Sequence, residues 1–391
     1  MSRIAELIAK LCPNGIEYVK LGDVCTITKG KTPIQKAIPG EYPLVVTTSE
    51  RKSCNTYQFD KSAVCIPLVS SRGHGVASLN HVYFQSGKFA LGNILCAVIP
   101  NDENVLSANF LFHYLEYKKD TLLVPLMKGG ANVSLHIYDI QRVKIPLPPL
   151  DVQLETIEIL DKFVELSEML TKELSIRKKQ YEYYRDLLLD FGVHGGATSE
   201  CKWRTIKLGD IGKISMCKRI MKSETSPDGD IPFYKIGTFG GEPNAYISRE
   251  TFEKYKSMYS FPKKGDILIS AAGTIGRTVV YDGEPAYYQD SNIVWIDNDE
   301  TKVINRYLYY VYQLSPWQIS TGGTIARLYN DNIANAKINI PSIKEQERIV
   351  SILDRFDKLC NDISEGLPAE IEARRKQYEY YRDKLLSFKE Q

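Results

Sequence analysis

The chain has 391 residues and a formal net charge of only +2, from 50 Lys and Arg against 48 Asp and Glu. This length corresponds to about two to four domains. A composition with 43% hydrophobic and 25% charged residues excludes a disordered or collagen-like chain. Taken as a total, the small charge argues against a nucleic-acid-binding protein, because such proteins are usually basic.

The first residues do not have the pattern of a signal peptide. Arg3, Glu6 and Lys10 interrupt the apolar residues of the N-terminal segment as in an amphipathic helix. No stretch approaches the roughly 20 apolar residues of a membrane span. The eight cysteines form no CxxC pair and no disulfide framework, so we expect reduced thiols. These features predict a cytoplasmic protein without a membrane segment.

The sequence contains an internal repeat. KQYEYYRD stands at 179–186 and again at 376–383, an offset of 197 residues. Upstream, KIPLPPLDVQLETIEILDKF at 144–163 aligns with residues 337–356 at an offset of 193, and KLGDVCTITKGK at 20–31 aligns with KLGDIGKISMCK at an offset of 187. Offsets that drift so little indicate a tandem duplication of the full length.

Each copy has two parts of different character. The first part, near 15–145 and 203–338, alternates short apolar runs with Gly, Pro, Asn and Ser, which is typical of strands and turns. The second part, near 151–191 and 344–388, carries apolar residues at a spacing of three to four, which predicts a long helix that packs on another helix. Gly366-Leu367-Pro368 is expected to break or kink the second helix, because proline lacks a backbone donor.

The sequence therefore predicts an α+β chain in which two globular β-rich domains are separated by two long antiparallel α-helices, related as a pseudo-two-fold tandem duplication. We expect globular domains at 1–150 and 192–343 and helical segments at 151–191 and 344–391. The residues expected in the helix pair or its partner interface are Leu160, Phe163, Tyr181, Tyr184, Leu188, Phe356, Tyr378, Tyr381 and Leu385.

The charge is informative when it is counted by segment. Residues 1–150 carry 16 basic and 11 acidic side chains, and residues 192–343 carry 18 and 16. The helical segments carry 6 against 10 and 10 against 11. The small total is therefore a difference between globular domains at +7 and helices at −5. Binding of a polyanion belongs to the globular domains, because phosphate would be repelled by the acidic helices.

Motifs for catalysis and for metals are missing. The Gly-Lys-Thr at 30–32 has Cys25 where a phosphate-binding loop needs its first glycine, and the sequence has no Asn- or Asp-Pro-Pro-Tyr tetrad of an amino-methyltransferase. Cys54, Cys65, His74, His81 and Cys96 could be argued as a metal site, but buried thiols beside loop histidines are commoner. We expect no catalytic residue, no metal and no cofactor in this chain.

Loops that follow strands carry the candidates for contact with a polyanion such as a nucleic acid. Lysine and arginine hold phosphates, arginine reads guanine, and glycine allows close approach of the backbone. The candidates are Lys29, Lys31, Lys36, Ser71, Arg72, His74, Gly129 and Gly130 in the first copy, and Lys218, Arg219, Lys222, Thr274, Arg277, Gly322, Gly323, Thr324 and Arg327 in the second. The competing interpretations are solvated basic turns, surface ion pairs and tight turns.

A resemblance to a known family extends over essentially the whole chain. It is carried by the duplicated layout, the segment IPLPPLDVQLETIEILDKF at 145–163, the repeated KQYEYYRD, the KLGD that opens each globular half and LCPNGIEYVKLGD at 11–23. In these features the sequence resembles the DNA-specificity subunits of type I restriction–modification systems. Any one motif would be a weak signal, whereas their ordered repetition is specific.

The resemblance implies a division of tasks. Each globular half would be a target-recognition domain that reads one half of a bipartite, asymmetric sequence in double-stranded DNA. The antiparallel helices would set the spacing of the half-sites and dock two modification subunits, which are S-adenosylmethionine-dependent adenine-N6 methyltransferases. Restriction subunits, up to two, would add ATP-driven translocation and cleavage. The specificity subunit would catalyse nothing, and S-adenosylmethionine, Mg²⁺ and ATP would belong to its partners.

Two other hypotheses remain open at this point. The first is a self-contained DNA methyltransferase or nuclease with duplicated recognition domains. The second is a structural coiled-coil adaptor that does not contact DNA.

Overall fold

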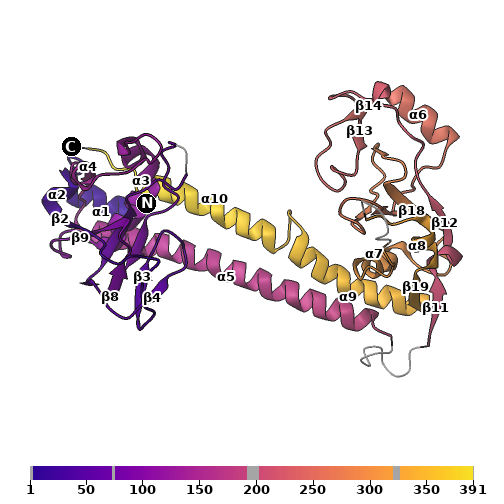
Figure 1. The fold of residues 1–391 in the computed structure, drawn as a ribbon, viewed down its shortest axis with the longest axis horizontal. Coiled ribbons are helices and arrows are strands. Elements are labelled where there is room, and N and C mark those ends of the chain that lie inside the picture. The colour runs from indigo at the N-terminus through magenta and orange to yellow at the C-terminus, as the bar shows by residue number, and fades with distance from the viewer. Residues whose placement is uncertain (1–2, 73–74, 192–201, 320–325, 391) are drawn as a thin grey trace. The chain divides into compact units, whose positions relative to one another are not determined.

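The computed structural model describes residues 3–72, 75–191, 202–319 and 326–390 (Figure 1). It divides into two compact units: unit 1 consists of Met1–Thr171 with Glu370–Gln391, and unit 2 consists of Lys172–Ala369. Each unit therefore combines one globular β-rich domain with parts of the long helices of both repeats.

The globular domain of unit 1 contains three sheets. Its elements are α1 (Arg3–Leu11), β1 (Tyr18–Lys20), α2 (Leu21–Val24), β2 (Cys25–Lys29), β3 (Tyr42–Val45), β4 (Lys52–Cys54), β5 (Phe59–Asp60), β6 (Ala63–Pro67), β7 (Tyr83–Gln85), β8 (Lys88–Leu91), β9 (Leu95–Pro100), α3 (Ala108–Leu122), a 3₁₀ turn (Val124–Leu126), α4 (Ile137–Gln141) and β10 (Lys144–Pro146). The strand orders are β2-β9-β6-β7, β4-β3-β8-β5 and β1-β10. Among the strands that the structure describes in this domain, β3 and β8 are parallel and the other neighbours are antiparallel.

The central strands of unit 1 are apolar along their whole length because both of their faces are covered. Every residue of β6 and β9 is buried. Alternate residues of a strand point to opposite faces, and here Val64 and Ile66 belong to the core that contains Phe110 of α3. Cys65 lies in the core on the other face, which contains Phe89 of the second sheet. The expectation of short apolar strands is thus confirmed.

The globular domain of unit 2 repeats this plan. Its elements are β11 (Trp203–Lys207), a 3₁₀ turn (Leu208–Asp210), β12 (Gly212–Ser215), a second 3₁₀ turn (Lys222–Glu224), β13 (Ile231–Tyr234), β14 (Tyr246–Ile247), α6 (Arg249–Met258), β15 (Ile267–Ser270), β16 (Thr278–Val280), β17 (Tyr287–Tyr288), β18 (Ile293–Asn298), α7 (Asn305–Gln313), α8 (Asn330–Asn335) and β19 (Lys337–Pro341). The strand orders are β12-β18-β15-β16, β14-β13-β17 and β11-β19.

The two domains share one topology. The sheet β12-β18-β15-β16 corresponds to β2-β9-β6-β7, and β11-β19 corresponds to β1-β10. The single parallel pair recurs as well, since β13 and β17 are parallel as β3 and β8 are. This correspondence confirms the tandem duplication and the α+β fold class expected from the sequence.

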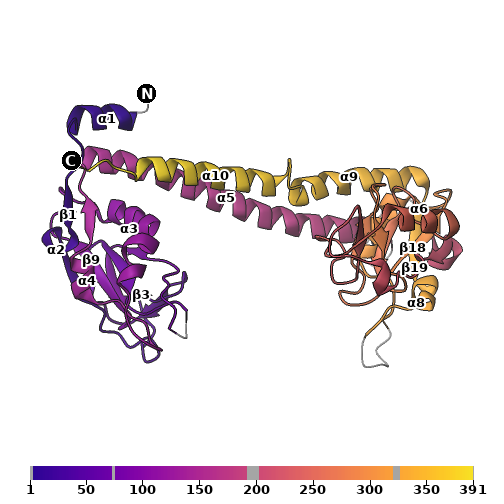
Figure 2. The same ribbon diagram turned by 90° about the horizontal axis from the view of Figure 1, so that it is seen from above.

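Long helices complete both units. Helix α5 (Leu150–Leu189) begins in unit 1 and ends in unit 2, and the second repeat supplies α9 (Ile343–Asn361) and α10 (Leu367–Leu385). In unit 1, α5 leaves the globular domain and α10 returns to it, so the two helices are antiparallel (Figure 1). In unit 2, α9 follows β19 directly (Figure 2) and packs on α7 of the globular domain (Figure 1).

The second helical segment is interrupted, as the sequence predicts, but Pro368 lies just after the break. Helix α9 ends at Asn361, and α10 has already begun at Leu367, with Pro368 in its first turn. Proline is tolerated there because that part of a helix has N–H groups without intrahelical partners. The break itself is the turn 362–366, where Asp362 accepts hydrogen bonds from the N–H groups of Ser364 and Glu365.

Candidate nucleic-acid interface

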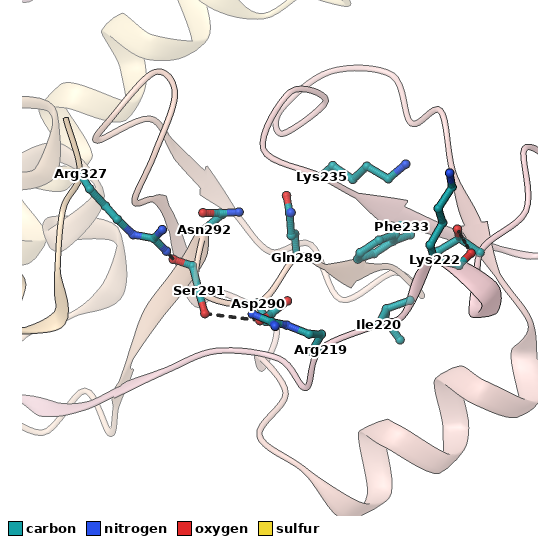
Figure 3. A pocket seen from close by; sticks show the side chains of 11 residues that line it. Arg219, Ile220, Lys222, Phe233, Lys235, Gln289, Asp290, Ser291, Asn292 and Arg327 are labelled. Carbon is teal, nitrogen blue, oxygen red and sulfur yellow. Dashed lines mark hydrogen bonds and ion pairs between the residues drawn. The ribbon is translucent and has the colours of Figure 1, made fainter. Parts of the chain in front are cut away.

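The side chains in the strand-end loops of unit 2 surround a pocket of about 330 Å³ (Figure 3). One wall is the segment between β12 and the turn Lys222–Glu224, and another is the end of β13. The floor is the loop 289–292, which joins β17 to β18. The residues that line the pocket are Arg219, Ile220, Lys222, Thr225, Phe233, Lys235, Gln289, Asp290, Ser291, Asn292 and Arg327.

Three residues predicted from the sequence meet in this pocket, namely Arg219, Lys222 and Arg327. The sequence reasoning missed Lys235, Gln289 and Asn292. Lys235 and Gln289 come together because β13 and β17 pair in parallel, with Tyr234 opposite Tyr288. A strand of two residues carries no recognisable periodicity, so the sequence held no signal for this pairing.

The pocket is positively charged. Four cationic side chains line it, and the single carboxylate among the lining residues, Asp290, is paired with Arg219 at 2.9 Å. Such a concave, cationic surface attracts a polyanion. The turn that carries Lys222 is fixed to α6, because Glu224 accepts hydrogen bonds from the Met221 N–H at 2.7 Å and from the Tyr255 hydroxyl at 2.8 Å. These two hydrogen bonds lower the pKa of Glu224, the one from Met221 most strongly.

The floor of the pocket has an unusual backbone. Ser291 has a φ of 59°, which non-glycine residues seldom adopt and which often marks a functional loop. Arg327 donates from Nη2 to the Ser291 carbonyl oxygen at 2.6 Å, and Gln289 N–H bonds to the Tyr234 carbonyl oxygen at 2.9 Å. The loop is therefore held from two sides.

Unit 1 has a pocket of about 520 Å³ beside the segment that follows β2, and residues 54–58 form its other wall. Lys31 and Lys36, both predicted from the sequence, line it together with the polar residues Asn55 and Gln58. Gln58 also fixes the segment, because its Nε2 donates to the Lys29 carbonyl oxygen and its Oε1 accepts the Lys31 N–H, both at 2.9 Å. Lys29 is exposed at the end of β2 but does not line the pocket.

A second group of predicted residues lies on two adjacent loops of unit 1. Ser71 and Arg72 are exposed on the loop after β6. This loop contacts the loop of Gly129 and Gly130, because Ser70 N–H bonds to the Val133 carbonyl oxygen at 3.0 Å. Gly129 has a φ of 139°, and a Cβ there would meet the Asn132 oxygen at 2.2 Å, so glycine is required for the turn. His74 lies outside the described residues.

The corresponding loop of unit 2 carries Thr274 and Arg277. Thr274 is exposed, whereas Arg277 is tied back to the protein, because its Nη1 donates to the Phe239 carbonyl oxygen at 2.8 Å. Lys218 is exposed and its ammonium group lies 5.1 Å from the centre of the Tyr259 ring. Gly322, Gly323 and Thr324 lie outside the described residues.

The residues predicted for the helix pair lie in the two units. Leu160, Tyr378 and Leu385 belong to the core of unit 1, and Tyr181, Leu188 and Phe356 belong to the core of unit 2. Tyr181 donates a hydrogen bond to Gln313 at 2.7 Å and so joins α5 to α7. The remaining pair members form ring stacks between helices, Phe163 with Tyr381 and Tyr184 with Phe356.

Residues 3–72, 75–191, 202–319 and 326–390 contain no group of three or more His, Cys, Asp or Glu side chains placed to hold a metal ion. Within these ranges, no helix has the length and apolarity required to cross a membrane.

Comparison with known proteins identifies the family. The family model described as the type I restriction modification DNA specificity domain matches residues 13–176 and again residues 200–373. A Haemophilus influenzae protein designated type I restriction enzyme specificity subunit S.HindORF215P is 45% identical over 384 residues, which cover 95% of this chain and 96% of that protein. The specificity subunit of EcoR124I/EcoR124II from Escherichia coli is 34% identical over 71% of each chain.

Solved structures share the fold. The S subunit of a type I restriction–modification system from M. genitalium matches with a TM-score of 0.62 at 15% identity, covering 96% of this chain and 97% of that chain. A chain from a study of complex assembly in the type I R-M system matches with a TM-score of 0.53 at 19% identity, covering 96% and 98%. The chain thus belongs to the family of type I restriction–modification specificity subunits, whose role is DNA specificity and not catalysis.

Proposed function

We propose that the chain reads a bipartite, asymmetric sequence in double-stranded DNA, with residues 1–150 as one target-recognition domain and residues 192–343 as the other. The observation that carries this proposal is that each globular domain has a pocket with lysines in its lining. Each pocket lies beside the segment after the first strand of the central sheet, and each is lined by lysines together with side-chain amides. Cations hold the phosphate backbone, and amides can read base edges.

The two half-sites should differ in sequence because the two pockets differ in their side chains. The pocket of unit 1 presents Lys31 and Lys36 with Asn55 and Gln58. The pocket of unit 2 presents two lysines and two arginines with Gln289 and Asn292. A common fold with unlike contact residues is the expected design for an asymmetric target.

The helical segments at 151–191 and 344–391 are proposed to set the spacing of the half-sites. They are also proposed to dock two modification subunits per specificity subunit and, in a full restriction complex, the restriction subunits. Two facts support this. The relative from Escherichia coli is named as the specificity subunit of a type I restriction enzyme, and Tyr183 and Tyr380, at equivalent places of KQYEYYRD, are 63% and 61% exposed. S-adenosylmethionine, Mg²⁺ and ATP would be held by those partners, in the cytoplasm where the DNA lies.

The alternative of a self-contained methyltransferase or nuclease predicts activity of the isolated chain, which the proposed role excludes. The purified chain alone, incubated with S-adenosylmethionine and duplex DNA, should transfer no methyl group and cut no strand. Activity of the isolated chain above that of a sample with the reading domains deleted would contradict the proposed role.

Genome-wide mapping of adenine methylation tests the proposal itself. Deleting the gene should abolish methylation at one bipartite motif, with two unlike halves at a fixed separation, and restoring the gene should restore it. Retention of every methylated motif after deletion would contradict DNA reading and would favour a structural adaptor.

A further inference from the structure

We infer that three kinds of side chain in the pocket of unit 2 have different roles. Asn292, assisted by Gln289, reads an adenine in the major groove, and Lys222 and Lys235 hold the flanking phosphates. Arg219 and Arg327 position the loop 289–292, which carries the two amides. The inference rests on the proposed function, since it assigns tasks within the second target-recognition domain. It changes the expectation for the two arginines, which the sequence alone marks as candidates for direct contact with DNA.

The arginines are already engaged by the loop that they border. Arg219 Nε donates to Asp290 Oδ2 at 2.9 Å, which offsets its charge locally. Arg327 Nη2 donates to the carbonyl oxygen of the next residue, Ser291, at 2.6 Å. In Figure 3 Arg327 reaches the loop from one side and Arg219 from another. Two guanidinium groups thus hold two consecutive residues of the pocket floor.

The backbone of this loop is fixed at every residue. Ser291 adopts a left-handed φ of 59°, and the hydrogen bonds on either side of it hold that conformation. Asn292 N–H bonds to the Asp290 oxygen at 2.7 Å, and the Asn292 carbonyl oxygen accepts the Ala271 N–H at 2.7 Å. A rigid backbone presents its side chains in one direction, which is what discrimination between similar base edges requires.

The two amides of the loop differ in what they can still bind. Gln289 Oε1 accepts the Ile236 N–H at 2.8 Å, which leaves its amino group as a donor toward the pocket. The half-buried side chain of Asn292 makes no hydrogen bond with any residue in the described part of the chain, and it points toward Gln289 (Figure 3). An asparagine with both amide atoms free matches the N6 donor and N7 acceptor of adenine. The Gln289 amino group then suits an acceptor on the adjoining base.

Lys222 and Lys235 have the properties of phosphate contacts. Neither forms an ion pair with another described residue, and both border the pocket that contains the amides. An ammonium group is a compact charge without the planar geometry that distinguishes bases. These two lysines therefore supply affinity and its dependence on salt, whereas the amides supply sequence preference.

Selection from a randomised duplex pool tests the assignment. The full chain, in complex with the modification subunit with which it is expressed, is incubated with duplexes randomised at both half-sites, and the bound fraction is sequenced. Asn292→Ala should reduce the preference for adenine at one position of the second half-site by roughly 5- to 150-fold. Preferences elsewhere should be unchanged. Asn292→Asp should move that preference toward cytosine, because a carboxylate accepts from the cytosine amino group. Asn244→Ala, which removes another exposed amide, serves as the control.

Titrations at several salt concentrations separate the lysines from the arginines. Lys222→Ala and Lys235→Ala should each weaken binding to all sequences and lower the slope of log affinity against log salt by about 1, with the base preference retained. Lys264→Ala, an exposed lysine outside the pocket, should leave the slope unchanged. Arg327→Met should weaken the same adenine preference as Asn292→Ala while leaving the salt slope intact, which loss of a phosphate contact would not do.

Three outcomes would overturn the inference: unchanged base preference in both Asn292 variants, altered base preference in the lysine variants, or a fall of the salt slope in Arg327→Met. Selection of no bipartite motif by the wild-type complex would instead refute the proposed function. The two failures are therefore distinguishable in the same experiment.

Discussion

Tyr381 stacks on Phe163 in unit 1, with ring centroids 5.4 Å apart and planes inclined by 23°. The equivalent residues of the other repeat form the same stack in unit 2, where Tyr184 and Phe356 lie 5.6 Å apart at 26°. Each stack therefore joins a phenylalanine of one repeat to a tyrosine of the other. The same contact between repeats therefore occurs twice, because Phe163 and Tyr184 of α5 each stack on a ring of the second repeat.

The stacked residues lie on either side of the position at which the repeat offset changes from 193 to 197. Phe163 and Tyr184 are 21 residues apart, whereas Phe356 and Tyr381 are 25 residues apart. The four additional residues amount to about one helical turn, and the turn 362–366 between α9 and α10 is where the second helical segment leaves the helical path. The continuous helix α5 of the first repeat thus corresponds to two helices, α9 and α10, in the second repeat.

Removing one ring of a stack should destabilise the unit that contains it. Tyr381→Ala is expected to lower the free energy of unfolding by about 1–2 kcal/mol, because the ring is only partly exposed and loses an aromatic partner. Tyr380→Ala, which removes the adjacent and more exposed ring, should change it by less than about 0.5 kcal/mol. Urea unfolding of both variants gives the comparison, and equal effects would contradict the role of the stack.

Lengthening α5 should widen the DNA spacer. Four residues inserted between Phe163 and Tyr184 would give that segment the 25-residue separation already present between Phe356 and Tyr381. Four residues add about 6 Å of helix, which corresponds to about two base pairs. Methylation mapping in cells with the insertion should show the same half-sites at a larger separation. An unchanged spacer would contradict the proposal that the helices set the separation of the half-sites.

Two buried glutamines attach the long helices to the globular domains. In unit 1, Gln153 donates to the carbonyl oxygens of Val105 and Pro148 at 2.8 and 2.7 Å and accepts the Ser107 N–H at 2.9 Å. In unit 2, Gln346 makes the corresponding three bonds. Both side chains are fully buried. The helices are therefore held at their first turns by the same device in each repeat.

Gln346→Met should lower the stability of unit 2 by about 2–4 kcal/mol, because a buried N–H and two carbonyl groups lose their partner. The three tryptophans of the chain, at 203, 295 and 317, all belong to unit 2, so tryptophan fluorescence follows its unfolding. Glu347→Gln, at the exposed neighbouring position, is the control. A midpoint of unfolding equal to that of the control would show that the glutamine is dispensable.

A buried histidine in unit 1 should make the stability of that unit depend on pH. His113 is buried, and its Nε2 lies 2.8 Å from Asp161 Oδ1. Burial lowers the pKa of His113 below its ordinary value of 6.5, against the opposing effect of Asp161. The folded state then binds a proton less readily than the unfolded state, so this contribution to stability is present above pH 6.5 and is lost as the pH falls through the lowered pKa.

The thermal midpoint of unit 1 should therefore decrease between pH 7 and pH 5, and His113→Gln should reduce that decrease because glutamine does not titrate. His136→Gln changes an exposed histidine and should leave the dependence as it is in the wild type. Calorimetry at the two pH values provides the measurement. Parallel pH dependences of wild type and His113→Gln would exclude the histidine as the cause.

The sequence predicts the architecture well because the repeat and the helical periodicity are long-range signals. It also predicts part of the site, since Arg219 and Lys222 follow a strand equivalent to the one that precedes Lys31 and Lys36 in the first copy. Arg219 and Asp290 are separated by 71 residues in the sequence, and their pairing depends on how short strands pack together. No local pattern announces that contact.

The amides at the centre of the pocket could not be predicted for the same reason. Gln289 and Asn292 flank a residue with an unusual φ and follow a strand of two residues, Tyr287–Tyr288. Asparagine and glutamine are common in ordinary turns, so their identity alone does not separate a base-reading loop from a connecting loop. Only the parallel pairing of β13 with β17 places them beside Lys235.

The most direct test of two independent reading domains exchanges one of them. Residues 203–336 are replaced by the corresponding residues of a divergent relative, and adenine methylation is mapped in cells that carry the chimaera with the same modification subunit. The chimaera should direct methylation to a new sequence in one half-site, with the other half-site and the spacer retained. Changes in both half-sites would contradict independent reading by the two domains.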